Sequence, residues 1–319
     1  MYCELLNKNS LKKSKNFKCL TRELHLAIGI FDGLHLGHQA VIRTAIYSAK
    51  KNNGCSGVLT FNPHPSVVLK NSSQAKLIMH PKIRLLDLVN MGIDKVFQIK
   101  FTIEFARISA KLFLPLLKSR FPDLKAIYIG NDFRFGIKRS GTISTLVKTG
   151  IMLGIRIYSI GNIKQNEKKI SSTQIRKELI QGNIKYANTL LGYRYYSQSK
   201  VIEGAHRGKL LGFPTLNFYW ENELQVKYGV YIVFLIDLCR KKRLRAIANF
   251  GLRPTIANDR NPVLEVHSLE YTLLSINEKA KIEWLDFLRP EKKFQSIKAL
   301  KIQIKEDCKR AIKIFDKKF

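Results

Sequence analysis

A glycine-rich stretch between an apolar run and an amphipathic segment constrains the fold of this chain more than any other feature. Residues 29–38 read Gly-Ile-Phe-Asp-Gly-Leu-His-Leu-Gly-His. An apolar run over 24–30 precedes them, and the segment 38–52 that follows has apolar residues at helical spacing. The pattern predicts a strand, a turn and a helix, which is how α/β proteins hold phosphate on the free N–H groups of a helix start. His35 and His38 stand at that start, so we expect a phosphate site there.

Strand-like and helix-like segments alternate through the first half of the chain, after a polar lead-in over residues 1–20. We expect strands over 24–30, 56–61, 95–99, 126–129 and 156–160, and helices over 38–52, 81–91, 102–120, 145–154 and 173–181. Alternation of this kind requires crossover connections, so it predicts an α/β, Rossmann-like parallel sheet.

The pattern changes after about residue 185. Strand-like runs at 228–238, 244–249 and 264–274 are separated by turn residues, with no expected helix until 296–316. This favours an antiparallel β-barrel closed by a C-terminal helix. At 319 residues the chain suits two domains, which we place at 1–185 and 186–319.

The chain has 56 basic and 24 acidic residues, a formal net charge of +32. Binding of a polyanion would explain such a charge, and so would compositional drift towards lysine. The charge is dispersed, with only short clusters such as 240–243, and we favour drift. A positive field would still attract small phosphorylated substrates.

Cysteine content and hydropathy bear on where the chain works. Its five cysteines form no C-x-x-C pair, and their odd number argues against a disulfide framework, so we expect a reducing cytoplasm. The first twenty residues lack the apolar core of a secretory signal. The longest apolar run, 228–238, is too short to span a bilayer, so we expect no membrane association.

Four unusual segments of the first half follow the ends of expected strands: 29–38, 61–65, 130–136 and 171–176. Ligands of open α/β sheets bind outside the carboxyl ends of the strands, so we expect these segments to form one cleft. An imidazole of His35 or His38 can donate a hydrogen bond to charge on a transferring phosphoryl group. Asp32 either stabilises the turn or serves the site, and the sequence leaves both open.

The second half has its own dense stretch at 201–217. Glycines at 204, 208 and 212 permit close approach of backbone to a ligand, but the Gly-Lys-Ser/Thr ending of a Walker loop is absent. Thr215 and Asn217 alternate, so in an extended segment they face one side. Their neutral oxygens, with nucleotide phosphates and waters, could hold Mg²⁺. A plain Pro-Thr turn is the alternative.

The first half contains four motifs: Gly-x-Phe-Asp-Gly-x-His-x-Gly-His at 29–38, Phe-x-Pro-His-Pro at 61–65, Gly-x-Asp-Phe-x-Phe-Gly at 130–136 and Ile-Ser-Ser-Thr-x-Ile-Arg at 170–176. Together they resemble the prokaryotic FAD synthetase module of the HxGH nucleotidyltransferase superfamily. The resemblance implies adenylyl transfer from ATP to FMN, giving FAD and pyrophosphate. It implies that His35 and His38 stabilise the ATP phosphates and the pentavalent transition state. The other ATP-binding residues that it implies are Gly29, Phe31, Asp32, Gly37, Asp132, Ser172, Thr173 and Arg176. Lys169 departs from the arginine expected there and lacks its bidentate fork.

The second half contains five motifs: Gly-Lys-x-Leu-Gly-Phe-Pro-Thr-x-Asn at 208–217, Tyr-Gly-Val-Tyr at 228–231, Asn-Phe-Gly-x-Arg-Pro-Thr at 249–255, Leu-Glu-Val-His at 264–267 and Leu-Arg-Pro-Glu-x-Lys-Phe at 288–294. In this order they are similar to the motifs of riboflavin kinase. The resemblance implies that Thr215 and Asn217 bind Mg²⁺ with ATP and that Glu265 is the base for the riboflavin 5′-hydroxyl. It further implies phosphate contacts from Gly208 and Lys209 and flavin contacts from Phe213 and Arg289.

Three functions are compatible with these sequence features. The first is a bifunctional riboflavin kinase and FAD synthetase using riboflavin, FMN and ATP, with no obligate protein partner. The second function is also nucleotidyl transfer but to a different acceptor, since the two histidines alone do not identify the acceptor molecule. The third is a basic nucleic-acid-binding protein, and the dispersed charge and lack of a known nucleic-acid module count against it.

Overall fold

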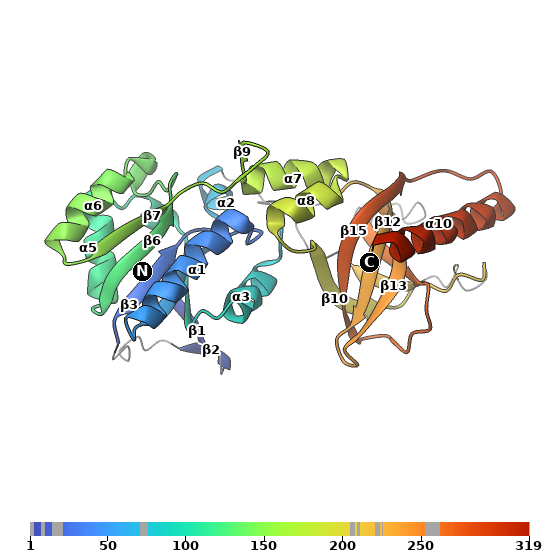
Figure 1. Ribbon diagram of the computed structural model, residues 1–319, viewed down its shortest axis with the longest axis horizontal. Coiled ribbons are helices and arrows are strands. Elements are labelled where there is room, and N and C mark those ends of the chain that lie inside the picture. The colour runs from blue at the N-terminus through green and yellow to red at the C-terminus, as the bar shows by residue number, and fades with distance from the viewer. Residues whose placement is uncertain are drawn as a thin grey trace. The chain divides into compact units, whose positions relative to one another are not determined.

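A seven-stranded sheet organises the first part of the chain (Figure 1). The computed structural model describes residues 3–7, 10–14, 22–70, 76–204, 208, 211–220, 224, 226–252 and 262–318. The sheet order is β2-β1-β5-β4-β3-β6-β7. Its parallel strands are β3 (Leu24–Ile28), β4 (Cys55–Asn62), β5 (Lys95–Lys100), β6 (Leu124–Gly130) and β7 (Arg156–Ile160). Every residue of β3 is buried, as expected for a central strand with both faces covered. The expected α/β parallel sheet is confirmed.

Helices connect these strands. They are α1 (Leu36–Lys51), α2 (Pro65–Lys70), α3 (Pro81–Asn90), α4 (Ile103–Ala106), α5 (Ala110–Arg120), the 3₁₀ turn η1 (Ile137–Arg139) and α6 (Ile143–Met152). Helix α1 packs on β3, β4 and β6. A short hairpin, β8 (Lys164–Gln165) and β9 (Lys168–Lys169), precedes α7 (Ser172–Gln181) and α8 (Ile184–Leu191).

The single helix expected over 102–120 is wrong, because the chain forms α4 and α5 with a break between them. The Ile108 carbonyl accepts a hydrogen bond of 2.8 Å from the Ile137 N–H, outside either helix. Nearby, a side chain at Gly136 would place its Cβ 2.8 Å from the Ala110 backbone nitrogen. This close tertiary packing at the break overrides a helical pattern that is continuous in the sequence.

The polar lead-in expected over residues 1–20 is also wrong. Residues Cys3–Asn7 form β1 and Ser10–Ser14 form β2, and β1 pairs with β5 in antiparallel register. Strand pairing uses main-chain groups that every residue except proline carries, so a polar segment can extend a sheet at its edge.

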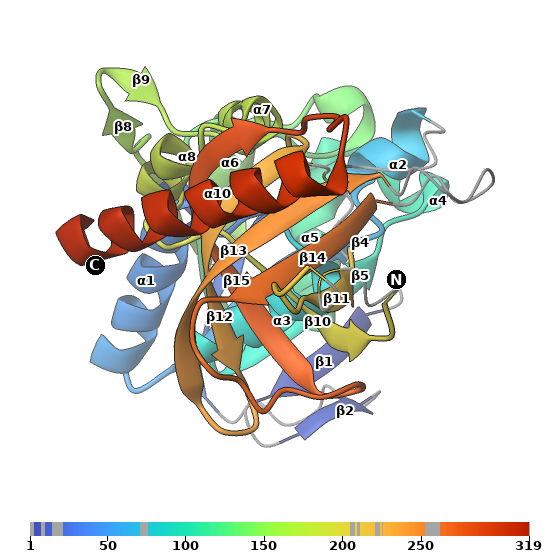
Figure 2. The same cartoon turned by 90° about the vertical axis from the view of Figure 1, so that its right-hand side faces the viewer.

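A closed antiparallel barrel forms the second part, in the order β10-β11-β14-β13-β12-β15 (Figure 2). Its strands are β10 (Tyr196–Ile202), β11 (Leu216–Tyr219), β12 (Gly229–Asp237), β13 (Lys242–Leu252), β14 (Pro262–Ser268) and β15 (Lys279–Pro290). Helix α10 (Ile297–Lys318) packs on β13, and its Ala311 and Phe315 join Val230, Ile232 and Phe234 in one apolar cluster. The expected barrel with a C-terminal helix is confirmed.

The strand expected over 264–274 is too long, since β14 ends at Ser268. The Ser268 hydroxyl donates to the Glu270 carbonyl at 2.6 Å, and the Glu270 N–H donates back to that hydroxyl at 3.3 Å. This local turn ends the strand, because a serine side chain can replace a ladder partner of the backbone. Strands β10, β11 and β15 were not expected.

Contacts between residues divide the chain into two compact units, Met1–Ser172 and Thr173–Phe319. The division falls at the start of α7, and our boundary at 185/186 stays a prediction. Within the part of the chain that the structure describes, no helix is long and apolar enough to cross a membrane.

Candidate functional site

Two histidines meet at the first turn of α1. His35 is the N-cap residue, and its Nδ1 accepts a hydrogen bond of 3.3 Å from the His38 backbone N–H. Because Nδ1 accepts, the neutral imidazole carries its proton on Nε2. The two rings stack with centroids 3.6 Å apart. A Cβ at Gly37 would lie only 3.2 Å from His35 Cε1, so glycine there leaves room for this stack.

The turn before α1 has backbone that side chains rarely adopt. Phe31 has a φ of +55°, Gly33 of +76° and Leu34 of +37°. For the two non-glycine residues such angles cost about 1 kcal/mol or more each. The Phe31 ring, 2% exposed, packs edge-on against His38 at a centroid distance of 5.4 Å. A Cβ at Gly29 would lie 2.9 Å from that ring, so glycine lets the turn close.

Asp32 anchors this turn to a distant segment. Its carboxylate is 1% exposed and accepts hydrogen bonds from the backbone N–H of Ile78, at 3.1 Å, and of Met79, at 3.5 Å. These bonds tie the carboxylate to residues far along the chain. The geometry therefore gives Asp32 a structural use, and its role toward ATP stays a prediction.

Arg84 of α3 fixes the carboxyl ends of two strands, and we did not single it out from the sequence. Its guanidinium, 1% exposed, donates to the Ile30 carbonyl at 3.0 Å and to the Phe61 carbonyl at 3.2 Å. The Thr60 hydroxyl also donates to Ile30, at 3.0 Å. The sequence held only a weak indication of this role. Arg84 lies beside Ile83 on the buried face of α3, and a buried arginine needs hydrogen-bond partners.

We expect Arg84→Met to lower the free energy of unfolding of the first unit by about 2–4 kcal/mol, because the Phe61 carbonyl loses the guanidinium and the Ile30 carbonyl keeps the Thr60 hydroxyl but loses the charged donor. Thermal unfolding followed by far-UV circular dichroism measures the loss. Arg107→Leu, at an exposed arginine of the same unit, is the control. An unchanged melting temperature for Arg84→Met would contradict the anchoring role.

Two of the expected loops are joined to their neighbours within the first unit. The Ser172 hydroxyl donates to the Asp32 carbonyl at 3.0 Å, which brings the start of α7 to the turn before α1. Lys169 forms an ion pair with Asp132, so the lysine keeps a charged contact although it lacks an arginine's fork. Thr173 and Arg176 follow on α7, on the second unit's side of the division.

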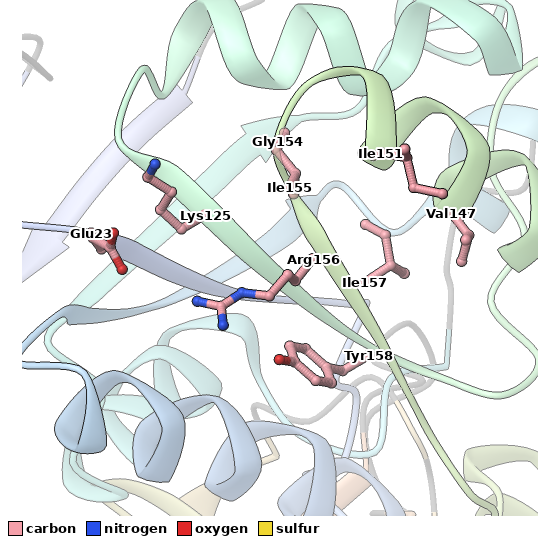
Figure 3. Close-up of a pocket in the computed structure, with 10 residues that line it drawn as sticks. Glu23, Lys125, Val147, Ile151, Gly154, Ile155, Arg156, Ile157 and Tyr158 are labelled. Atoms are coloured by element: carbon pink, nitrogen blue, oxygen red, sulfur yellow. The ribbon is translucent and has the colours of Figure 1, made fainter.

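A cavity of about 570 Å³ lies near the amino ends of the parallel strands, away from the carboxyl ends where the helix-start site lies (Figure 3). It is lined by Glu23, Lys125, Val147, Gly150, Ile151 and residues 154–158. Glu23 precedes β3, while Lys125 and Arg156 begin β6 and β7, so these are the amino ends of the strands. The cavity is therefore separate from the helix-start site.

His25 is a fully buried histidine of β3. Its Nδ1 lies 3.0 Å from the Tyr128 hydroxyl, and its Nε2 is buried with no hydrogen-bond partner among the described residues. Burial lowers the pKa of His25 below 6.5, and the charge of Arg156 lowers it further, against a smaller opposing effect of Glu23. The folded protein thus keeps this imidazole neutral.

The first unit is expected to lose stability as the pH falls below about 6.5, because unfolded His25 then binds a proton that the folded state does not. Melting temperatures recorded between about pH 8 and pH 5.5 measure the slope. His25→Gln should flatten it, since glutamine does not titrate. An identical slope in the variant would assign the pH dependence to other groups.

The second unit brings Asn217 and Glu265 together by strand register. Asn217 of β11 is directly opposite Glu265 of β14, which is in turn opposite Asn249 of β13. Directly opposed residues share a face of the sheet, with Cβ atoms about 5 Å apart. The three polar residues therefore form a row on that face, while their neighbours Phe218, Leu264 and Phe250 are buried.

Asn217 fits a metal ligand. It is 5% exposed, and its Oδ1 is buried with no hydrogen-bond partner among the described residues. An unpartnered amide oxygen suits Mg²⁺, which takes oxygen ligands and completes its shell with phosphates and water. Within the described residues, no cluster of three or more His, Cys, Asp or Glu could hold a metal. Neutral oxygens at Asn217 and Thr215 are the candidate donors.

Two glycines, Gly204 and Gly208, lie close to the candidate ligands Asn217 and Thr215. A Cβ at Gly204 would collide with Asn217 Nδ2, and one at Gly208 would collide with the Phe213 carbonyl and lie 3.0 Å from Thr215 Oγ1. Glycine is therefore required for the observed approach at both positions. Lys209 lies outside the described residues.

Arg289 is engaged by α10. Its Nε lies 2.9 Å and its Nη2 2.7 Å from Asp307 Oδ2, and its Nη1 donates to the Pro290 carbonyl at 3.0 Å. Asp307 is 1% exposed, so this is a buried, two-pronged ion pair of the strong kind. It ties the end of β15 to the C-terminal helix.

The paired histidines at a helix start on a parallel sheet, and the closed barrel that follows with candidate oxygen donors at Thr215 and Asn217, fit a two-domain transferase that uses nucleotides. The family model described as FAD synthetase matches residues 18–174, and the model described as riboflavin kinase matches 191–315. The chain belongs to the family of bifunctional riboflavin kinase/FMN adenylyltransferases.

Relatives with that name match along most of their length. The protein of Buchnera aphidicola subsp. Schizaphis graminum is 33% identical over 303 residues, covering 94% of this chain and 97% of its own. That of Listeria monocytogenes is 34% identical over 285 residues, covering 88% and 89%. A Streptococcus pneumoniae crystal structure described as a macrolide-efflux protein has a TM-score of 0.80 and 28% identity, covering 92% of this chain and 94% of that one.

Proposed function

We propose that this chain phosphorylates riboflavin to FMN in its barrel and adenylylates FMN to FAD, with release of pyrophosphate, at the start of α1. ATP is the co-substrate of both steps. The observation that carries the proposal is that each matched family domain retains its own polar site. His35 and His38 stack at the helix start, and Asn217 and Glu265 stand opposite each other in the barrel.

In the adenylylation step, the first N–H groups of α1 and the two imidazoles act on the ATP phosphates. The developing charge on the transferring phosphoryl group is stabilised by donors that are already in place, and a donor of this kind is worth about 10²–10³ in rate. His35 is 5% exposed, so it acts where water screens little. Gly29, Phe31, Asp32, Gly37 and Asp132 shape the turn and loop, while Ser172, Thr173 and Arg176 hold the triphosphate.

In the kinase step, Glu265 accepts the proton of the riboflavin 5′-hydroxyl as this oxygen attacks the γ-phosphoryl group. Thr215 and Asn217 would hold Mg²⁺, which neutralises phosphate charge when bound. The register places Asn217 beside Glu265, so the base and a metal ligand lie together on one face. Phosphoryl transfer depends mostly on such positioning, because there is little covalent chemistry for the protein to do.

The remaining residues are assigned to binding. Gly208 and Lys209 contact the ATP phosphates in the barrel, and Phe213 contacts the flavin. Arg289 serves the flavin end by holding the backbone at Pro290, since its guanidinium is bound to Asp307. The chain works in a reducing cytoplasm, a setting that the free thiols of Cys55, Cys239 and Cys308 support.

A time course of flavin products separated by HPLC tests the proposal. Purified chain with riboflavin, ATP and Mg²⁺ should form FMN first and FAD later. Supplied FMN with ATP should give FAD without riboflavin. Absence of both products at high enzyme concentration would refute the proposal, and FMN without FAD would leave the acceptor of the first domain open to revision.

A further inference from the structure

His267 of β14 is bonded to the turn that carries one candidate metal ligand. Its Nδ1 lies 2.8 Å from the Pro214 carbonyl oxygen. A carbonyl only accepts, so Nδ1 carries a proton and donates it. Pro214 immediately precedes Thr215, and His267 lies two residues beyond Glu265 on the same face of β14. One hydrogen bond thus ties the turn of Thr215 to the strand of Glu265.

The turn needs such a tie, because β11 begins only at Leu216 and Thr215 lies outside the strand ladder. Strand pairing sets the position of Asn217, but it does not set that of Thr215. The Phe213 ring packs edge-on against His267 at a centroid distance of 5.5 Å, and the Phe213 N–H donates to the Gly208 carbonyl at 2.8 Å. The ring contact joins the turn to His267, and the hydrogen bond closes the turn itself.

We infer that His267 is a positioning residue for phosphoryl transfer, which holds the Thr215 hydroxyl at the distance from Asn217 and Glu265 that a metal–nucleotide complex requires. The inference rests on the proposed kinase function. Residues one shell behind a metal ligand orient it, and their loss commonly costs 10–100-fold in metal affinity. His267 acts through the backbone beside the ligand, so we expect an effect of about tenfold, at the lower end of that range.

Two substitutions separate the hydrogen bond from the bulk of the ring. His267→Asn places an amide N–H close to where Nδ1–H stands, whereas His267→Gln places its amide at the far position of the ring. Ser268→Ala is the matched control, since it removes a hydrogen bond from the next residue, which faces the other side of β14. All variants are made in the full chain.

Metal binding is read without turnover. The two tryptophans of the chain, Trp220 and Trp284, both lie in the second unit, so their fluorescence reports the barrel alone. Quenching by paramagnetic Mn²⁺ in the presence of ADP gives a half-saturating metal concentration. This concentration should rise about tenfold in His267→Gln. It should return to near the wild-type value in His267→Asn and stay unchanged in Ser268→Ala.

Kinetics give the second readout. The Mg²⁺ concentration for half-maximal FMN formation should rise in His267→Gln, while FAD formation from supplied FMN on the same chain stays unchanged. A His267→Gln variant with wild-type Mn²⁺ saturation would overturn the inference, and so would a His267→Asn variant no better than glutamine. A wild-type chain that forms no FMN would instead refute the proposed kinase function.

Discussion

FAD formation from supplied FMN is expected to fall at least a hundredfold when His38 is replaced by alanine, because a donor to the transferring phosphoryl group is lost. FMN formation from riboflavin should be unchanged, since Glu265, Thr215 and Asn217, which we propose for the kinase step, lie in the other unit. Both activities are measured by HPLC on one preparation. The kinase activity therefore serves as an internal check that the chain is folded.

The His38 ring also packs on Phe31, so a second variant separates chemistry from support. His38→Asn keeps a hydrogen-bond donor and should retain more activity than alanine. His80→Ala is the matched control, because His80 also lies at a helix start, that of α3, and its Nδ1 accepts from the Lys82 N–H. Wild-type rates of FAD formation in His38→Ala would remove His38 from the mechanism.

The reciprocal result is expected for Glu265→Gln. FMN formation should fall by about 10²–10⁴, the usual contribution of a positioned base, because the amide does not accept the hydroxyl proton. FAD formation from supplied FMN should continue at the wild-type rate. The main-chain pairing of Glu265 with Asn217 and Asn249 is independent of the side chain, so glutamine preserves the register.

Glu270→Gln is the control for this substitution. Glu270 lies just beyond the same strand, and its carboxylate forms a half-exposed ion pair with Arg245 at 2.6 Å. Pairs of this kind contribute about 0–1 kcal/mol, so both activities should persist. A Glu265→Gln variant that forms FMN at the wild-type rate would mean that another group accepts the proton.

The five parallel strands of the first unit could be predicted in order, because apolar runs are local properties of the sequence, whereas β1, β2 and the break between α4 and α5 could not. For the site, the loops that carry it could be predicted, but not the contacts between them. Nothing local to Arg84 indicates that it bonds the carbonyls of Ile30 and Phe61, and nothing local to Asp32 indicates that it holds residues 78–79. Such contacts depend on which segments the fold brings together.

The second unit shows the same limit more strongly. Strands β10 and β11 have little apolar alternation in the sequence, and their pairing comes from closure of the barrel. Strand β15 does alternate over Lys279–Trp284, so its local pattern would have allowed its prediction. That Thr215 and Asn217 share a side stays a prediction, since Thr215 lies outside the ladder of β11. Their relation to Glu265 and His267 depends on the register of β11 with β14, which separate segments set between them.

The row formed by Asn217, Glu265 and Asn249 makes the proposed kinase site depend on the alternation of side chains along β14. Along β14 the alternate residues Leu264 and Val266 are buried in the barrel, while Glu265 faces the other way. A shift of the strand by one residue would turn the carboxylate into the apolar interior and a valine toward the substrates. The barrel interior cannot accommodate a charged carboxylate in place of an apolar side chain. The packing of the interior therefore fixes the face of β14 on which Glu265, the proposed base, lies.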